Sequence, residues 1–418
     1  MNIILITFLS SLLIARLILQ AWLNLRQRRA LLQSWDSVPT AFQHQFSLEE
    51  HQKSIRYTVT KLNFSTARTL FSSLVMVTWL TTGVMGLLDS ILFVFVNDPV
   101  WQTIAFLGAF SFVEGLLSLP WSLYSQFVIE EKFGFNKMNS KIFITDMLKA
   151  TLLSVILGVI LGYPFVSLVH HVRGFWFIPA YLLFMSFQFL ILWIFPTFIA
   201  PLFNKFSILT DESLSGRIKQ LVEKAGFQSQ GVFVMDASKR SSHGNAYFTG
   251  IGKSKRIVFF DTLLTQLTSG QVLAVLAHEV GHLAHKHILK RLGVSLVTTM
   301  IGFTFLGWWA LRPDLVIDLG LSPSYGPTLL TGVWVLSLIT FPLSPISNWW
   351  SRKHEFQADQ YAVQETSAQD LGLALLELYR KNAGSLVVDP TYAAWNYSHP
   401  PLTERLAAMG YSGESSKD

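Results

Sequence analysis

One short pattern in the sequence has residue types that can do hydrolytic chemistry: His278-Glu279-Val-Gly-His282. Side chains four residues apart share one face of a helix, so both imidazoles can reach a single tetrahedral ion. Glu279 stands on the adjacent ridge, where it can take a proton from a metal-bound water. Apolar residues at 272, 273, 275 and 276 lead into the pattern and indicate a buried helix. The pattern therefore predicts a zinc site with Glu279 as general base.

A catalytic zinc usually has three protein ligands and one open position. His285 could supply the third, but three ligands from one straight helix would crowd a single flank. Asp314 and Asp318 are the only carboxylates between Ile288 and Lys353, and that interval contains no histidine. Both are predicted to lie across the membrane from the motif.

The first candidates after that interval are His354 and Glu355. Glu355 and Asp359 are four residues apart, so both face the same site if this segment is helical. Asp359 can then accept a hydrogen bond from the second nitrogen of a zinc histidine and fix its tautomer. We predict Glu355 as the third ligand and Asp359 as its supporting carboxylate, with one zinc ion per chain.

The composition indicates a membrane protein. Hydrophobic residues make up 51% of the 418 residues and charged residues 14%, against roughly 25% charged in an ordinary soluble domain. There is no cysteine, so any metal must bind His, Asp or Glu. The formal net charge is +6, but no run of basic and aromatic residues forms a nucleic-acid surface, and nucleic acid is excluded as a partner.

Seven stretches have the roughly 20 apolar residues that cross a bilayer. They are 3–23, 70–96, 101–123, 145–170, 175–199, 293–311 and 327–348. The first is predicted to be a retained span and not a signal peptide, because it contains Arg16 and is followed by basic residues instead of a cleavage site. These spans leave three longer polar pieces, at 24–69, 200–292 and 349–418.

Basic residues favour one side of the membrane, which predicts the orientation. The loops after the first and third spans contain Arg26, Arg28, Arg29, Lys53, Arg56, Lys61, Lys132, Lys137 and Lys141, whereas the opposite loops contain only Arg173 and Arg312. The three polar pieces are therefore expected in the cytoplasm. Short apolar runs at 231–235 and 256–260 predict two strands in the middle piece.

Together these features predict a mostly α fold of seven transmembrane helices with a cytoplasmic α+β catalytic domain. That domain is zincin-like and split around the last helix pair. Its two parts are 200–292, which carries the zinc motif, and 349–418, which carries the third ligand. The remaining units are span one at 1–23, a helical loop at 24–69, spans two to five at 70–199, and spans six and seven at 293–348.

The sequence resembles the CAAX prenyl endopeptidase family, the type that also matures the a-factor mating pheromone. Seven motifs in order carry the resemblance across most of the chain: SLEEHQK at 47–53, IEEKFGFNK at 129–137, APLFNKF at 200–206, RSSHGNAY at 240–247, the zinc motif, the segment 355–359 and HPPLTER at 399–405. The resemblance implies a barrel of seven helices around a water-filled chamber, within which the C-terminal region of a peptide or protein substrate, lipidated in some cases, is cleaved.

The resemblance also implies roles for three residues that spacing alone leaves open. Asn245 would bind the substrate backbone beside the zinc. His399 and Arg405 would contact the substrate or the oxyanion. From the residues alone, an asparagine in a strand-like loop is more often a turn residue, and His399-Pro-Pro fits the start of a helix that continues through Arg405. His243 is left unassigned.

Several alternatives remain at this stage. A quality-control metalloprotease of the heat-shock type shares the zinc motif, and a channel or transporter would fit the spans but not Glu279. Glu114 and Asp89 lie within predicted spans, where they face either a wet cavity or a partner helix. The expected location is a bacterial inner membrane, or the endoplasmic reticulum of a eukaryote. The sequence leaves the oligomeric state and the natural substrate undetermined.

Overall fold

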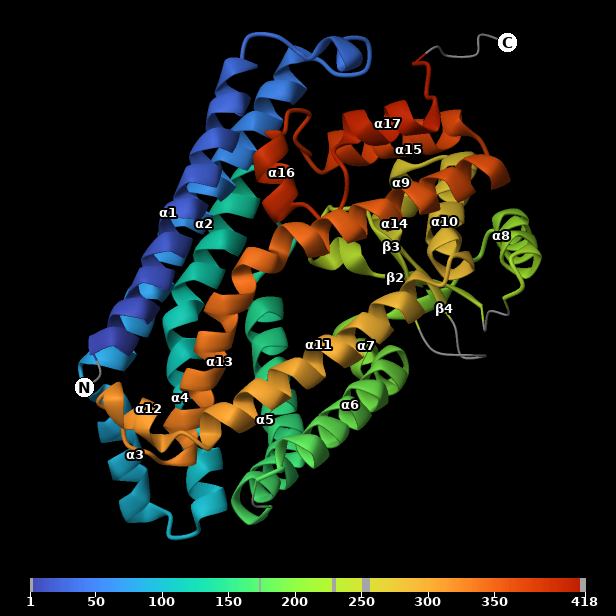
Figure 1. The fold of residues 1–418 in the computed structure, drawn as a ribbon. Helices are drawn as coiled ribbons and strands as arrows, with labels where there is room; N and C mark the ends of the chain where they lie inside the picture. Colours follow the sequence, from blue (N-terminus) through green and yellow to red (C-terminus); the bar gives the residue numbers. More distant parts are fainter. Residues whose placement is uncertain (1–2, 173, 228–230, 250–255, 414–418) are drawn as a thin grey trace.

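The computed structural model describes residues 3–172, 174–227, 231–249 and 256–413, and long helices make up most of it (Figure 1). Six helical segments within these ranges are long and apolar enough to cross a membrane, and a bent pair makes a seventh. The helices that form them are α1 (Ile3–Gln33), the pair α2 (Leu48–Thr81) and α3 (Val84–Phe95), α4 (Pro99–Tyr124), α5 (Ser140–His171), α6 (Phe177–Ile194), α11 (His287–Ala310) and α13 (Tyr325–Thr340). This agrees with the seven predicted spans.

The second span agrees with the prediction at its C-terminal end and differs in its start and in an internal bend. Helix α2 begins at Leu48, where Ser47 and Glu50 form a capping box. It then continues without a break into the predicted span. Inside the predicted span the chain bends by 61° between α2 and α3. Gly83 lies in this bend with φ of 76°, a conformation that glycine adopts without steric cost.

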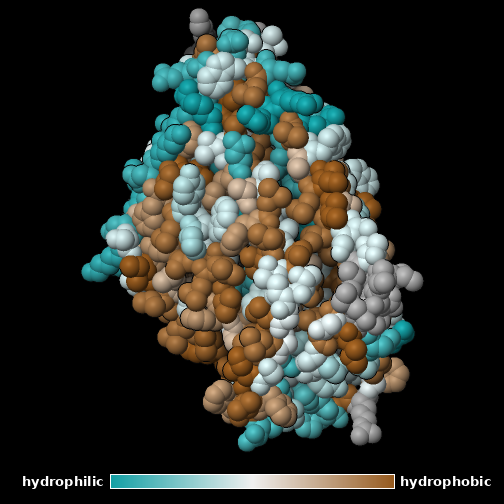
Figure 2. Space-filling view, turned by 90° about the vertical axis from the view of Figure 1, so that its left-hand side faces the viewer, coloured by the Kyte–Doolittle hydropathy of each residue, from teal (hydrophilic) through white to brown (hydrophobic). Residues whose placement is uncertain are grey.

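The surface matches a membrane location. On the face shown in Figure 2, hydrophobic residues cover the middle of the molecule and hydrophilic residues gather at its two ends. Large apolar side chains of α5 such as Leu148, Leu152 and Ile160 are exposed, which is costly in water and favourable in lipid. Irregular π-helical turns at Ser125–Glu130 and Phe195–Ile199 extend α4 and α6.

A small mixed sheet lies outside the long helices. Its strands are β1 (Phe206–Ile208), β2 (Val232–Met235), β3 (Ala246–Thr249) and β4 (Arg256–Phe260), in the order β1-β2-β4-β3. Strands β2 and β4 pair in parallel, and β1 and β3 add on antiparallel. The predicted strands β2 and β4 are confirmed, whereas β1 and β3 were not predicted.

The two halves of the predicted catalytic domain also supply several helices. They are α7 (Ala200–Phe203), α8 (Glu212–Lys224), α9 (Asp261–Gln266), α10 (Ser269–Ala284), α14 (Ser344–Glu365), α15 (Ala368–Lys381), α16 (Pro390–Asn396) and α17 (Leu402–Met409), while the short α12 (Pro313–Asp318) lies between α11 and α13. Ile218, Phe259 and Leu276 share one hydrophobic cluster with Leu375 and Leu406. The two parts, separated in sequence by α11 and α13, therefore share one core.

Helices α10 and α14 approach each other closely in this core. A Cβ added to Gly281 would lie 3.0 Å from the Cα and 3.1 Å from the carbonyl oxygen of Ala358. Backbone cannot move aside as a flexible side chain can, so we expect Gly281→Ala to push the helices apart and cost about 1–3 kcal/mol. Thermal unfolding in detergent measures this. Gly293→Ala, with open space around the new methyl group, is the control and should be no less stable than the wild type.

Candidate metal centre

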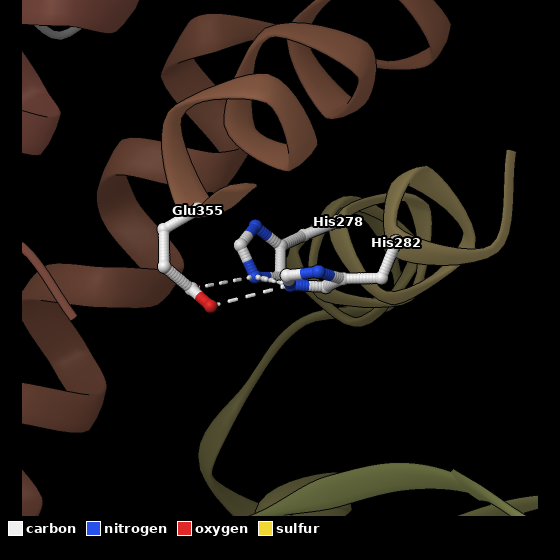
Figure 3. Close-up of side chains that lie close together, drawn as sticks. All are labelled: His278, His282 and Glu355. Atoms are coloured by element: carbon white, nitrogen blue, oxygen red, sulfur yellow. Dashed lines mark hydrogen bonds and ion pairs between the residues drawn. The ribbon is translucent and has the colours of Figure 1, made fainter. Parts of the chain in front are cut away.

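Two helices bring the predicted metal-binding side chains together. Helix α10 begins with a capping box of Thr268 and Gln271 and carries His278 and His282 in its last two turns. Helix α14 crosses it and presents Glu355. Figure 3 shows the two imidazoles from one helix and the carboxylate from the other pointing toward one another.

The three side chains have the geometry and chemistry of a metal site. One ligand atom from each lies within 4.8 Å of the others. The Nε2 atom of His278 lies 3.4 Å from Glu355 Oε2, and that of His282 lies 3.5 Å from Glu355 Oε1. Glu355 is 2% exposed, yet its Oε2 accepts no hydrogen bond, which leaves a buried lone pair for a cation. Two imidazoles and one carboxylate fit zinc, which takes nitrogen and oxygen ligands with one position open.

The alternative ligands considered from the sequence lie outside this group. His285 directly follows α10 as its C-cap residue, and its ring stacks on His287 at 5.5 Å. His354 is buried and also stacks on His287, with ring centroids 4.0 Å apart. Across the residues that the structure describes, His278, His282 and Glu355 form the single group of three that could hold an ion.

The second nitrogen of His278 contacts a buried ion pair. His278 Nδ1 lies 2.8 Å from Asp359 Oδ1. Arg405 donates to both oxygens of that carboxylate, from Nη2 at 2.6 Å and from Nε at 2.8 Å. The side chains of Asp359 and Arg405 are 1% and 9% exposed. The predicted contact of Arg405 with substrate or oxyanion remains a prediction, since the polar partners of its guanidinium here are Asp359 and His278.

Breaking this pair leaves a buried carboxylate without its cation. We expect Arg405→Ala to lower the free energy of unfolding by about 3–5 kcal/mol. Arg405→Lys should recover only part of it, because an ammonium cannot make the two-pronged contact. Thermal unfolding in detergent measures both. If Arg405→Ala were as stable as the wild type, the Arg405–Asp359 pair would not contribute to the free energy of unfolding.

Glu279 lies beside the group and is half-buried. Burial raises the pKa of its carboxyl above the ordinary value, opposed by His278 and reinforced by the nearby Glu355 charge. His399 is open to solvent, with a side chain 65% exposed and Nε2 3.6 Å from Glu355 Oε2. Asn245, just before β3, is exposed, and its Oδ1 accepts from the backbone of Ala246. The positions of Glu279 and His399 suit groups that meet a substrate.

Sequence reasoning missed two residues at this site. Arg291 Nη2 lies 3.9 Å from Glu355 Oε1. His287 Nδ1 lies 3.0 Å from Nδ1 of His282. The residue types were visible in the sequence, but the helix break between α10 and α11 that turns His287 back toward His282 was not predicted.

The polar residues left unassigned by the sequence also have partners. Asp89 accepts hydrogen bonds from Ser322 and Ser324, which join α3 to the start of α13. Glu114 accepts from the indole of Trp79. Both are therefore contacts between neighbouring elements. His243 contacts the side chain of Asn382 at 2.9 Å and stacks on Phe135.

A helical membrane region joined to a domain with two histidines of an H-E-x-x-H helix and a glutamate from a second helix defines a membrane-embedded metallopeptidase. Comparison with known families gives the same class. Residues 27–205 match "CAAX prenyl protease N-terminal, five membrane helices", and residues 209–412 match "Peptidase family M48". The chain belongs to the CAAX prenyl protease family within the M48 metalloproteases, a family of zinc enzymes.

Individual relatives are similar over nearly the whole chain. CAAX prenyl protease 1 of Saccharomyces cerevisiae is 35% identical, with 97% of this chain and 95% of the relative covered. The Arabidopsis thaliana homologue is 34% identical, with 96% of each covered. The crystal structure of S. mikatae Ste24p matches with a TM-score of 0.90 and 33% identity, covering 96% of this chain and 98% of that one. The fold and the metalloprotease class predicted from the sequence are confirmed, as is the prediction of an integral membrane protein, and the channel alternative is excluded.

Proposed function

We propose that this chain cleaves peptide bonds near the C-terminus of prenylated, CAAX-type peptide or protein substrates, with one zinc ion held by His278, His282 and Glu355. The observation that carries the proposal is the buried Glu355 carboxylate, which faces His278 and His282 and whose Oε2 accepts no hydrogen bond. The substrate class comes from relatives named CAAX prenyl protease 1 along nearly all of their length.

A zinc ion held by His278, His282 and Glu355 would supply the Lewis-acid chemistry of peptide hydrolysis. Glu279 removes the proton from the attacking water and delivers it to the leaving amine. His399 donates to the oxyanion, for which its solvent-open position beside Glu355 suits it. Asn245, an exposed residue just before the edge strand β3, binds the substrate backbone. Arg405 acts through Asp359, which holds the ring of His278.

The side of the membrane is also part of the proposal. The predicted loops that carry most of the basic residues lie on the same side as the catalytic domain, so this domain faces the cytoplasm. This holds whether the membrane is a bacterial inner membrane or that of the endoplasmic reticulum. We also propose the division into units given by the sequence, with a catalytic domain formed by 200–292 and 349–418. The hydrophobic core that these two parts share supports it.

The direct test is cleavage of a quenched fluorescent peptide by detergent-purified protein, with and without a farnesylated cysteine four residues from the C-terminus. We expect chelator-sensitive cleavage and a preference for the farnesylated peptide. Equal cleavage of both peptides, together with cleavage of unfolded proteins, would replace the CAAX substrate by a quality-control role. No cleavage of any substrate by protein that contains zinc would contradict the peptidase proposal.

A further inference from the structure

The two candidate zinc histidines differ in what holds their second nitrogen. His278 has the carboxylate of Asp359 at 2.8 Å. His282 has another imidazole, that of His287, with 3.0 Å between the two Nδ1 atoms. The far nitrogen of His287, Nε2, lies 2.8 Å from Gln357 Oε1. One side of the metal group is therefore supported by a chain of three side chains from α10, α11 and α14.

A break in the helix creates this contact. In a continuous helix, residues five apart point about 140° away from one another. Helix α10 ends at Ala284, Lys286 adopts a left-handed φ of 56°, and α11 begins at His287. The turn brings the His287 ring back to the ring of His282. A left-handed non-glycine residue costs on the order of 1–2 kcal/mol, so this geometry is held by its surroundings.

One consistent set of hydrogen-bond directions runs from His282 through His287 to Gln357. To offer a lone pair at Nε2, neutral His282 must carry its proton on Nδ1 and donate it to His287. His287 then accepts at Nδ1, carries its own proton on Nε2, and donates to the amide oxygen of Gln357. Each contact pairs one donor with one acceptor. In the opposite direction His282 would be protonated at Nε2 and could not bind a metal.

The ring of His287 has little freedom to turn. The residue is 1% exposed. His354 stacks on one face with ring centroids 4.0 Å apart at 12°, and His285 stacks at 5.5 Å and 15°. A buried imidazole stacked on two nearly parallel rings keeps its nitrogens aimed at His282 and Gln357.

We infer that His287 is a positioning residue for the metal site: it fixes the tautomer and ring orientation of His282, as Asp359 does for His278. Outer partners of this kind change metal affinity by roughly 10–100-fold when removed. Gln357 is exposed and contributes less. The inference rests on the proposed zinc function, because only a metal at His282 gives the orientation a consequence.

The test is the zinc dissociation constant of the full-length protein in detergent, measured by competition with a chelator. We expect His287→Phe, which keeps an aromatic ring but has no acceptor, to weaken zinc binding roughly 10–100-fold. His287→Asn places an amide oxygen where Nδ1 stood and should recover most of the affinity. Gln357→Leu should give a loss of a few-fold. His285→Phe, which keeps the stacked ring, is the matched control and should bind zinc as the wild type does.

Thermal unfolding of the metal-free variants separates positioning from packing. Unchanged metal-free stability with weakened zinc binding in His287→Phe, recovered in His287→Asn, supports the inference. Wild-type affinity in His287→Phe, or equal losses in the Phe and Asn variants, would overturn it. If His287→Phe does not fold, Gln357→Leu decides, because it leaves the ring in place. A wild-type protein that binds no zinc would instead overturn the proposed function.

Discussion

Replacing Glu279 by Gln should lower the rate of peptide cleavage by about 10²–10⁴-fold while zinc remains bound at one ion per chain. The amide keeps the size of the side chain but cannot accept the proton of the attacking water. Neither the His278–Asp359 contact nor the Glu355 contacts involve Glu279, so the metal site should stay intact. Turnover of a quenched peptide and metal analysis of the same preparation measure the two quantities.

Glu404→Gln is the matched control for this experiment. Glu404 is an exposed glutamate on α17, next to Arg405 in sequence, with no ion pair among those described. The control should cleave at the wild-type rate. Normal turnover by Glu279→Gln would remove Glu279 from the mechanism. Loss of zinc from that variant would mean that the carboxylate has a structural role as well.

Replacing Glu355 by Ala should weaken zinc binding by more than about 100-fold, the upper range for residues that only orient a ligand. The change removes the only anionic donor of the group and leaves two neutral imidazoles. Cleavage should fall in proportion to the metal lost. Chelator competition gives the affinity, and added zinc in excess shows whether activity returns.

Glu365→Ala tests whether any acidic residue of α14 would have the same effect. Glu365 lies at the end of the same helix, almost three turns beyond Glu355, and pairs with Lys224 at 2.7 Å. Its replacement should leave the zinc affinity at the wild-type value. Wild-type zinc content in Glu355→Ala would move the third ligand to His285 or His354.

Much of the fold followed from local patterns in the sequence. Apolar runs of membrane length predicted the spans, because the bilayer requires about 20 apolar residues per helix whatever lies beside it. The strands β2 and β4 were visible as short apolar runs for a similar reason. Strands β1 and β3 were not, since edge strands of three and four residues depend on pairing with their neighbours.

The catalytic motif was also a local property. His278 and His282 share a helix face by the geometry of the helix alone. The same geometry places Glu279 on the adjacent ridge. Glu355 was found by elimination along the chain, because few other acidic residues could reach the motif. Its contact with the histidines depends on the crossing of α10 and α14, which the lack of a side chain at Gly281 permits.

The sequence by itself determined the class of protein: a chain with seven apolar spans and a zinc-binding helix, since both depend on the order and spacing of residues within single helices. Only the tertiary structure decided how the metal ligands are held. The Arg405 pair with Asp359 and the contact of His287 with His282 arise from packing between helices and from one left-handed residue, Lys286. Such contacts have no periodicity in the sequence, because their geometry is set by which elements meet.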